Sequence, residues 1–202
     1  MAKVKRIFDI TFSLGAILFF LPLGLGIILC TWFSSPGPVL YSCRRVGKGG
    51  RSIYCWKFRT MCVDAERRLG EILLDPVAKE EWDTYYKLKN DPRIHAVGKF
   101  LRKTSLDELP QFFNVLKGDL SVVGPRPVTE EEVLKYFGAK AEKILSVRPG
   151  LTGIWQTSGR NLLTFEERLK LEENYVDQQS LLFDLQIIFK TIPAILFPKG
   201  AF

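Results

Sequence analysis

The longest apolar run in the chain lies near its N-terminus, where residues 10–33 carry no charged side chain. These 24 residues are enough for a helix to span a bilayer. Pro22, near the middle of the run, lacks a backbone N–H and predicts a bend or a break. A second apolar region, residues 181–197, is interrupted by two charges and a proline. We expect that region to lie on a membrane surface rather than cross it.

Between the two apolar regions, shorter patterns predict one compact α/β domain that is rich in helix. Alternation at residues 39–44 and 52–58 predicts two strands joined by a glycine-containing turn. Short extended segments are expected at residues 122–127 and 151–155. Helical patterns and their breakers predict helices over residues 64–89, 96–102, 110–117, 129–146 and 165–177.

The chain of 202 residues suits a single functional unit with its own core. We expect residues 1–36 to form a membrane segment. Residues 37–202 are expected to form a cytoplasmic catalytic domain that carries membrane-surface helices.

The course of the first apolar run through the membrane is open on these residues alone. Three basic residues precede it, starting at Lys3, and three follow it, ending at Lys48. Because both flanks are positive, the positive-inside rule does not orient a spanning helix. A helix that enters and leaves the same leaflet satisfies both flanks, and a plain spanning helix with a kink at Pro22 is the alternative.

The net charge of +7 is unevenly distributed. Residues 1–63 hold nine Lys and Arg against one acid, whereas the rest of the chain holds 20 basic and 21 acidic residues. Excess positive charge beside an apolar run suits an anionic lipid surface or a phosphate ligand. Nucleic acid is not expected as a partner, because basic nucleic-acid modules rarely carry such a run.

The four cysteines show no C-x-x-C spacing, and the single histidine, His95, is remote from them in sequence. This spacing argues against a zinc site and against a disulfide framework. A reducing, cytoplasmic setting fits best.

Asp107 and Glu108 form the most informative pair of acids. They lie near a predicted helix start, where backbone N–H groups favour an ionised carboxylate. Such a carboxylate can attack phosphorus or bind Mg²⁺. The alternative is a capping box between Ser105 and Glu108, although that box would place Pro110 inside the helix, where its missing N–H is unfavourable.

Several basic residues are candidates for binding phosphate. Arg126 is fixed between two prolines, which suits bidentate phosphate binding, and Arg160 lies in a tight turn. Lys57 and Arg59 alternate with apolar residues as on a half-buried strand, and Arg102 precedes the acidic pair. Each has a simpler alternative. For Arg126 and Arg160 it is a rigid turn with a solvated arginine. For Lys57 and Arg59 it is a pair of solvent-facing charges, and for Arg102 it is a basic helix end.

Asp184 lies in strongly apolar company, between phenylalanine and leucine. Such an acid is a partnered ion, a helix-start residue or a functional group with a raised pKa.

Six short motifs, taken in order, resemble the bacterial sugar transferase family, the monotopic phosphoglycosyl transferases that initiate exopolysaccharide, capsule and O-antigen synthesis. Any one of them is weak, but the ordered set is specific and covers nearly the whole chain. They are Lys57-Phe58-Arg59-Thr60-Met61, Lys103-Thr104-Ser105-Leu106-Asp107-Glu108-Leu109-Pro110-Gln111, Asn114-Val115-Leu116-Lys117-Gly118-Asp119, Val123-Gly124-Pro125-Arg126-Pro127, Arg148-Pro149-Gly150-Leu151-Thr152-Gly153 and Ser158-Gly159-Arg160-Asn161.

The resemblance implies a reaction. In the family, the Asp that matches Asp107 attacks the β-phosphate of a UDP-sugar, releases UMP and holds the sugar phosphate covalently. Polyprenyl phosphate, usually undecaprenyl phosphate, then accepts it. The acid that matches Glu108 is associated with a required Mg²⁺. The enzyme is expected at the cytoplasmic face of the bacterial inner membrane, in contact with membrane lipid.

The resemblance also implies roles for individual residues and a membrane course. Its motifs match Lys57, Arg102, Arg126, Arg160 and Asp184, which with Arg59 make up the expected substrate- and phosphate-binding set. The first apolar segment is expected to be re-entrant, as helix–break–helix. The family often has Ser-Pro at the break, where this chain has Leu21-Pro22.

Two other classes of protein compete with this interpretation. A polytopic sugar-phosphate transferase of another fold is disfavoured by the single long apolar run. A non-enzymatic membrane scaffold would tolerate loss of the acidic pair and the arginines.

The segment at residues 150–160 is more similar to members that use UDP-glucose or UDP-galactose than to those that use acetamido sugars.

Overall fold

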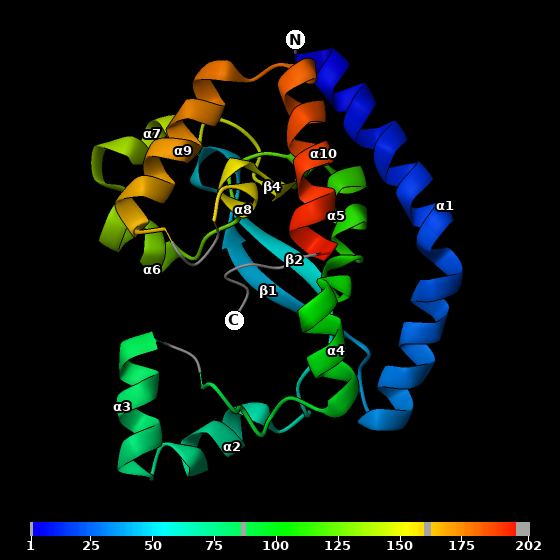
Figure 1. The fold of residues 1–202 in the computed structure, drawn as a ribbon, viewed down its shortest axis with the longest axis vertical. Coiled ribbons are helices and arrows are strands. Elements are labelled where there is room, and N and C mark those ends of the chain that lie inside the picture. Colours follow the sequence, from blue (N-terminus) through cyan, green and yellow to red (C-terminus); the bar gives the residue numbers. More distant parts are fainter. Residues whose placement is uncertain (1, 86–87, 160–162, 197–202) are drawn as a thin grey trace.

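The structure is a computed structural model that describes residues 2–85, 88–159 and 163–196. It is rich in helix and contains short strands, as the sequence predicts (Figure 1). One long helix, α1 (Ala2–Ser34), bows along one side of a body made of the other elements (Figure 1).

The helices of the body are short, apart from the last two. Their bounds are α2 (Ala65–Ile72), α3 (Pro76–Tyr85), α4 (Ala96–Thr104), α5 (Gln111–Lys117), α6 (Glu130–Glu132), α7 (Ala141–Ile144), α8 (Ile154–Thr157), α9 (Phe165–Gln178) and α10 (Leu181–Leu196). The 3₁₀ turns are η1 (Lys48–Gly50), η2 (Leu106–Glu108) and η4 (Gly138–Lys140), and η3 (Val133–Phe137) is a π-helix.

Four strands form two small sheets among the described residues. β1 (Leu40–Val46) pairs antiparallel with β2 (Ser52–Phe58), and the turn between them is η1. β3 (Ser121–Val123) pairs parallel with β4 (Gly150–Thr152). The predicted hairpin is confirmed, and its second strand has the predicted bounds because its alternating residues face the core and solvent in turn.

Two predicted helices are broken in the structure. The range 64–89 divides into α2 and α3 at Pro76, which begins α3 where a missing N–H is tolerated. The range 129–146 divides into four short helical pieces around Gly138, whose φ of 48° no regular right-handed helix contains.

The helix α1 differs from the helix–break–helix expectation, because it continues through Pro22 as one helix. A proline ring removes one backbone hydrogen bond, and a bowed helix accommodates that loss. Residues Lys3–Ser34 are long and apolar enough to cross a membrane. On the side away from the body, α1 exposes large apolar side chains such as Leu18, Phe19 and Phe33.

Both ends of α1 are fastened to the body. Near the N-terminal end, Lys5 donates to Asp184 of α10, and the Arg6 guanidinium donates to the Val115 carbonyl near the C-terminal end of α5. Near the other end, the Ser34 hydroxyl lies 3.3 Å from Nδ1 of His95, which caps α4. The helix therefore lies along the body rather than projecting from it.

The main core lies between the β1–β2 hairpin, α5, the β3–β4 pair and α10. Its fully buried members include Val115, Leu120, Val123 and Tyr175. Phe8 and Phe12 of α1 pack against it, so the apolar N-terminal helix is part of the same core.

Candidate functional site

The end of β2 and the short helix η2 bring three predicted site residues together. The ammonium Nζ of Lys57 lies 2.5 Å from Oε1 of Glu108 and 3.8 Å from Oδ2 of Asp107. The Asp107 side chain is 12% exposed, whereas that of Glu108 is 42% exposed. We call these three residues the carboxylate–lysine cluster; one of its carboxylates is buried and the other is open to solvent.

The backbone between α4 and α5 sets the direction of the acidic pair. Ser105 ends α4 in the left-handed region, with φ of 57°. Its side chain makes no capping hydrogen bond to η2, so the capping-box alternative is wrong. Pro110 precedes α5 as its N-cap and does not interrupt that helix. Glu108 is therefore free to reach Lys57.

The charge state of Asp107 follows from its burial. Burial raises the pKa of Asp107 to about 6, Glu108 raises it as well, and Lys57 and Arg102 oppose the rise. The carboxylate is thus ionised at neutral pH, but it is held in a poorly solvated position. For Lys57, burial alone lowers the pKa, and the two neighbouring carboxylates more than reverse this, so that the pKa lies above its ordinary value.

Arg102 supplies a second positive charge to Asp107. Its Nε donates to the Thr60 hydroxyl at 2.9 Å, which holds the guanidinium beside the strand end. Burial lowers the pKa of Arg102, and the charge of Asp107 opposes this. The motif at residues 57–61 therefore contains Lys57 and also Thr60, whose hydroxyl accepts the hydrogen bond that holds Arg102.

Asn114 fixes the distance between β2 and α5. Its side-chain Oδ1 accepts from the Trp56 backbone N–H at 2.9 Å, and its Nδ2 donates to the Tyr54 carbonyl at 2.7 Å. The side-chain amide of Asn114 thus bonds to the backbone of β2 next to Lys57, as a neighbouring strand would. We did not predict this role from the sequence, although the place of Asn114 in one of the six motifs, shortly after the acidic pair, is a signal that points to it.

The acidic pair fits a magnesium ion. No group of three or more His, Cys, Asp and Glu side chains in the described part of the chain is arranged to hold a metal. Mg²⁺ does not need such a group, since it binds through one or two carboxylates together with substrate phosphates and water. Glu108, whose carboxylate is open to solvent, has the chemistry of such a donor.

Arg126 belongs to a second group of residues. Its guanidinium lies over the Trp155 ring, with Cζ 4.7 Å from the ring centroid, and its backbone N–H donates to Oε1 of the buried Glu172. Arg168 stacks on the same indole. Among the described residues, these contacts join Arg126 to Trp155 and Glu172 and not to Asp107 or Glu108. We did not select Trp155, Arg168 and Glu172 from the sequence. No pattern in the sequence distinguishes them from ordinary core or solvent-facing residues.

Arg59 is turned inward. It is 8% exposed, and its Nη2 donates to the Ser35 carbonyl just beyond α1. The solvent-facing alternative is therefore wrong for Arg59. Its described contacts fasten the C-terminal end of α1 to the strand that carries Lys57, and they favour anchoring over phosphate binding.

Asp184 is a partnered ion. It is fully buried, its Oδ2 accepts from Lys5 at 2.7 Å, and its Oδ1 accepts from the Tyr175 hydroxyl at 2.8 Å. Because both oxygens have partners, its place favours anchoring of α1 over the predicted substrate binding. Arg160, the remaining predicted phosphate-binding residue, lies outside the described residues.

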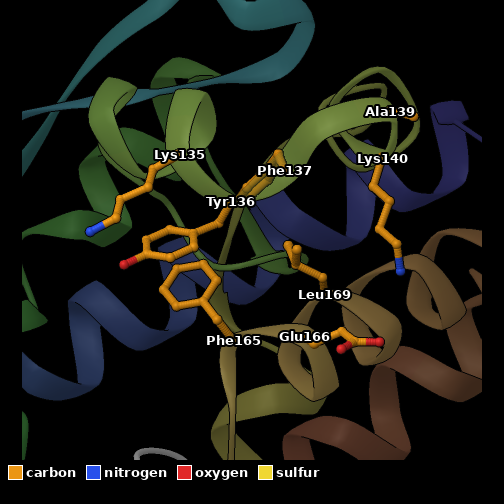
Figure 2. A pocket seen from close by; sticks show the side chains of 8 residues that line it. All are labelled: Lys135, Tyr136, Phe137, Ala139, Lys140, Phe165, Glu166 and Leu169. Carbon is orange, nitrogen blue, oxygen red and sulfur yellow. The ribbon is translucent and has the colours of Figure 1, made fainter.

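A surface pocket lies between η3, η4 and the start of α9, apart from the predicted site residues. Figure 2 shows the Tyr136 and Phe165 rings against each other, with Lys140 and Glu166 at the other end of the pocket. The two ring centroids are 3.9 Å apart. None of the predicted site residues that the structure describes lines this pocket.

Comparison with known proteins gives one family. The family model described as bacterial sugar transferase matches residues 1–198. The exopolysaccharide production protein ExoY of Sinorhizobium fredii is 46% identical over 98% of this chain and 88% of its own length. The undecaprenyl-phosphate galactose phosphotransferase of Salmonella typhimurium is 44% identical over 98% of this chain and 42% of its own length. The UDP-glucose:undecaprenyl-phosphate glucose-1-phosphate transferase of Escherichia coli is 37% identical over 94% of this chain and 39% of its own length.

Proposed function

This chain belongs to the bacterial sugar transferase family, and on that premise we propose that it transfers a sugar 1-phosphate from a UDP-sugar to polyprenyl phosphate. The proposal assigns the chemistry to the carboxylate–lysine cluster. It is supported most directly by the position of Asp107, a buried carboxylate beside the basic side chains of Lys57 and Arg102.

In the first step, an Asp107 oxygen attacks the β-phosphorus of the UDP-sugar. A new P–O bond to the carboxylate forms as the bond between the β-phosphorus and the bridging oxygen breaks, and UMP leaves with that oxygen. The product is an acyl phosphate that carries the sugar. In the second step, an oxygen of polyprenyl phosphate attacks the same phosphorus, the acyl phosphate bond breaks, and the Asp107 carboxylate is regenerated.

The neighbours of Asp107 have distinct roles. Lys57 and Arg102 favour the ionised carboxylate before attack and neutralise phosphate charge as it arrives. Glu108, held by Lys57 at one oxygen, holds Mg²⁺, which when bound neutralises the charge of the diphosphate. Arg126 binds a phosphate of the nucleotide in a bidentate manner.

The lipid acceptor places the reaction at a membrane. The outer side of α1 exposes an apolar surface, and α10 adds exposed apolar side chains such as Leu182 and Phe189. The contacts of both ends of α1 with the same body support a course in which both ends lie on the cytoplasmic side and the helix enters one leaflet without crossing. The chain thus lies on the cytoplasmic face of the inner membrane.

The donor sugar is glucose or galactose. This follows the names of the relatives from Salmonella and E. coli, which act on galactose and glucose, and the similarity of the segment at residues 150–160 to such members.

The test is UMP release by the purified chain in lipid nanodiscs with UDP-glucose or UDP-galactose and Mg²⁺. With undecaprenyl phosphate, we expect many turnovers; without it, about one UMP per chain, since the acyl phosphate forms once. Asp107→Asn is expected to release none, whereas the control Asp83→Asn, at an exposed position of α3, should behave as wild type. Absence of acceptor-dependent turnover with either sugar would refute the transferase assignment.

A further inference from the structure

Two guanidinium groups share one indole ring. The Cζ atoms of Arg126 and Arg168 each lie 4.7 Å from the centroid of the Trp155 ring. Trp155 and Arg168 are buried, whereas Arg126 is exposed. A guanidinium that stacks through its face keeps its N–H groups free at the edge, where they bind phosphate oxygens. The indole therefore orients Arg126 without occupying its donors.

The backbone of Arg126 is fixed by a buried acid. Pro125 and Pro127 have no backbone N–H, so the N–H of Arg126 is the one backbone donor that this tripeptide offers. That N–H donates to Oε1 of Glu172 at 3.2 Å. Glu172 is only 2% exposed, and burial raises its pKa to about 7, against the opposing effects of the Arg126 N–H and Arg168.

The two supporting residues of α9 are themselves braced. Arg168 and Glu172 are four positions apart, so they lie on one face of the helix. The guanidinium of Arg168 also lies over the Phe165 ring at 4.9 Å, and Phe165 stacks on Tyr136, as Figure 2 shows. A row of stacked groups thus runs from η3 through α9 and α8 to Arg126.

The buried polar atoms of this group do not all have hydrogen-bond partners among the described residues. Three of its buried atoms, Nε1 of Trp155, Nε of Arg168 and Oε2 of Glu172, have no hydrogen-bond partner in the described structure. Buried polar atoms of this kind destabilise a fold, and an arrangement that served stability alone would be better served by apolar side chains. Their concentration behind one exposed arginine points to a task performed by that arginine.

We propose that Trp155, Arg168 and Glu172 are positioning residues that hold the Arg126 guanidinium outward, with its edge presented to the diphosphate of the nucleotide-sugar. This rests on the proposed function, in which Arg126 binds that diphosphate. The ring of Trp155 fixes the plane of the guanidinium, and Glu172 fixes the backbone from which it extends. Arg168 lies over the same ring and holds the indole in place.

A double-mutant cycle tests the positioning role. Trp155→Leu removes the stacking and keeps an apolar side chain, so kcat/KM for the UDP-sugar should fall about tenfold in wild type, with KM rising more than kcat falls. In an Arg126→Ala background the same change should have an effect of less than about twofold, because there is no guanidinium left to position. Trp155→Phe keeps a ring and should lose only about threefold in wild type and nothing further in that background.

Two further variants separate positioning from general damage. Phe137→Leu truncates a buried aromatic residue of the neighbouring core cluster, and any loss should be the same in both backgrounds. Glu172→Gln keeps an oxygen that accepts the Arg126 N–H, so its kcat/KM should stay within about twofold of wild type, whereas Glu172→Met should lose activity only when Arg126 is present. These variants, with Trp155→Phe, carry the test if Trp155→Leu does not fold.

The outcomes distinguish the two proposals. If Arg126→Ala leaves kcat/KM unchanged, Arg126 does not bind the diphosphate, and that part of the proposed function fails together with the positioning role. If Arg126→Ala is damaging but the Trp155 and Glu172→Met variants lose equal factors in both backgrounds, these residues serve the fold only, and the positioning role alone is overturned.

Discussion

Nζ of Lys57 lies 2.5 Å from Oε1 of Glu108, across the gap between the end of β2 and η2. The same ammonium is 3.8 Å from Oδ2 of Asp107. A single lysine therefore stands between the carboxylate proposed to attack phosphorus and the carboxylate proposed to hold Mg²⁺. This contact gives the acidic pair a counter-charge before any substrate arrives.

Replacing Lys57 with Met removes that counter-charge. Lys57 opposes the burial-driven rise in the pKa of Asp107, so its loss should raise that pKa further and leave less ionised nucleophile at neutral pH. We expect the rate of single-turnover UMP release to fall about 100-fold, while Lys57→Arg retains part of the activity. Rapid-quench measurement of UMP with excess enzyme checks this. A wild-type rate in Lys57→Met would show that Lys57 does not contribute to the reaction of Asp107.

Glu108→Gln is expected to act through the metal. An amide oxygen is a weaker ligand for Mg²⁺ than a carboxylate, so the Mg²⁺ concentration for half-maximal UMP release should rise about tenfold or more. The control Glu131→Gln, at an exposed position of α6, should leave the curve unchanged. If Glu108→Gln and wild type give the same magnesium titration, Glu108 is not a ligand.

We expect Glu172 to make the free energy of unfolding depend on pH. Its pKa is raised from 4.5 to about 7, chiefly by burial, with Arg126 and Arg168 opposing the rise. A raised pKa means that the protonated form favours folding, so this contribution is complete below about pH 4.5 and is lost as the pH rises through 7. Glu172→Gln imitates the protonated form. It should be more stable than wild type by up to about 3 kcal/mol at pH 8 and equal to it near pH 4, in chemical unfolding curves.

The sequence predicted the cluster better than it predicted the surroundings. Strand alternation predicted a half-buried Lys57, and the motif set selected Asp107 and Glu108. The structure brings these three residues together, although Lys57 and Glu108 are 51 positions apart in the chain. The inward position of Arg59 was not predicted, because alternation describes a strand and β2 ends one residue earlier, at Phe58. Trp155 and Glu172 were missed because their partners come from separate elements, and no local pattern encodes that meeting.

The membrane course of α1 is open to direct test. Because both ends of the helix contact the body, cysteines introduced at Lys3 and Lys48 should react with a membrane-impermeant thiol reagent only from the cytoplasmic side, in a variant without the four native cysteines. Labelling of the two positions from opposite sides would establish a spanning helix. Pro22→Leu restores a backbone N–H in the middle of α1, and the same labelling shows whether it straightens the helix into a span.

The central claim is that Asp107 carries the sugar phosphate during the reaction. Intact-mass measurement of the chain after incubation with the UDP-sugar and Mg²⁺, with polyprenyl phosphate left out, tests it most directly. The account predicts a gain of one hexose phosphate that maps to Asp107, is absent in Asp107→Asn and disappears when polyprenyl phosphate is added. An unmodified chain that still turns over when the acceptor is present would contradict it, because the sugar phosphate would then pass directly from nucleotide to lipid.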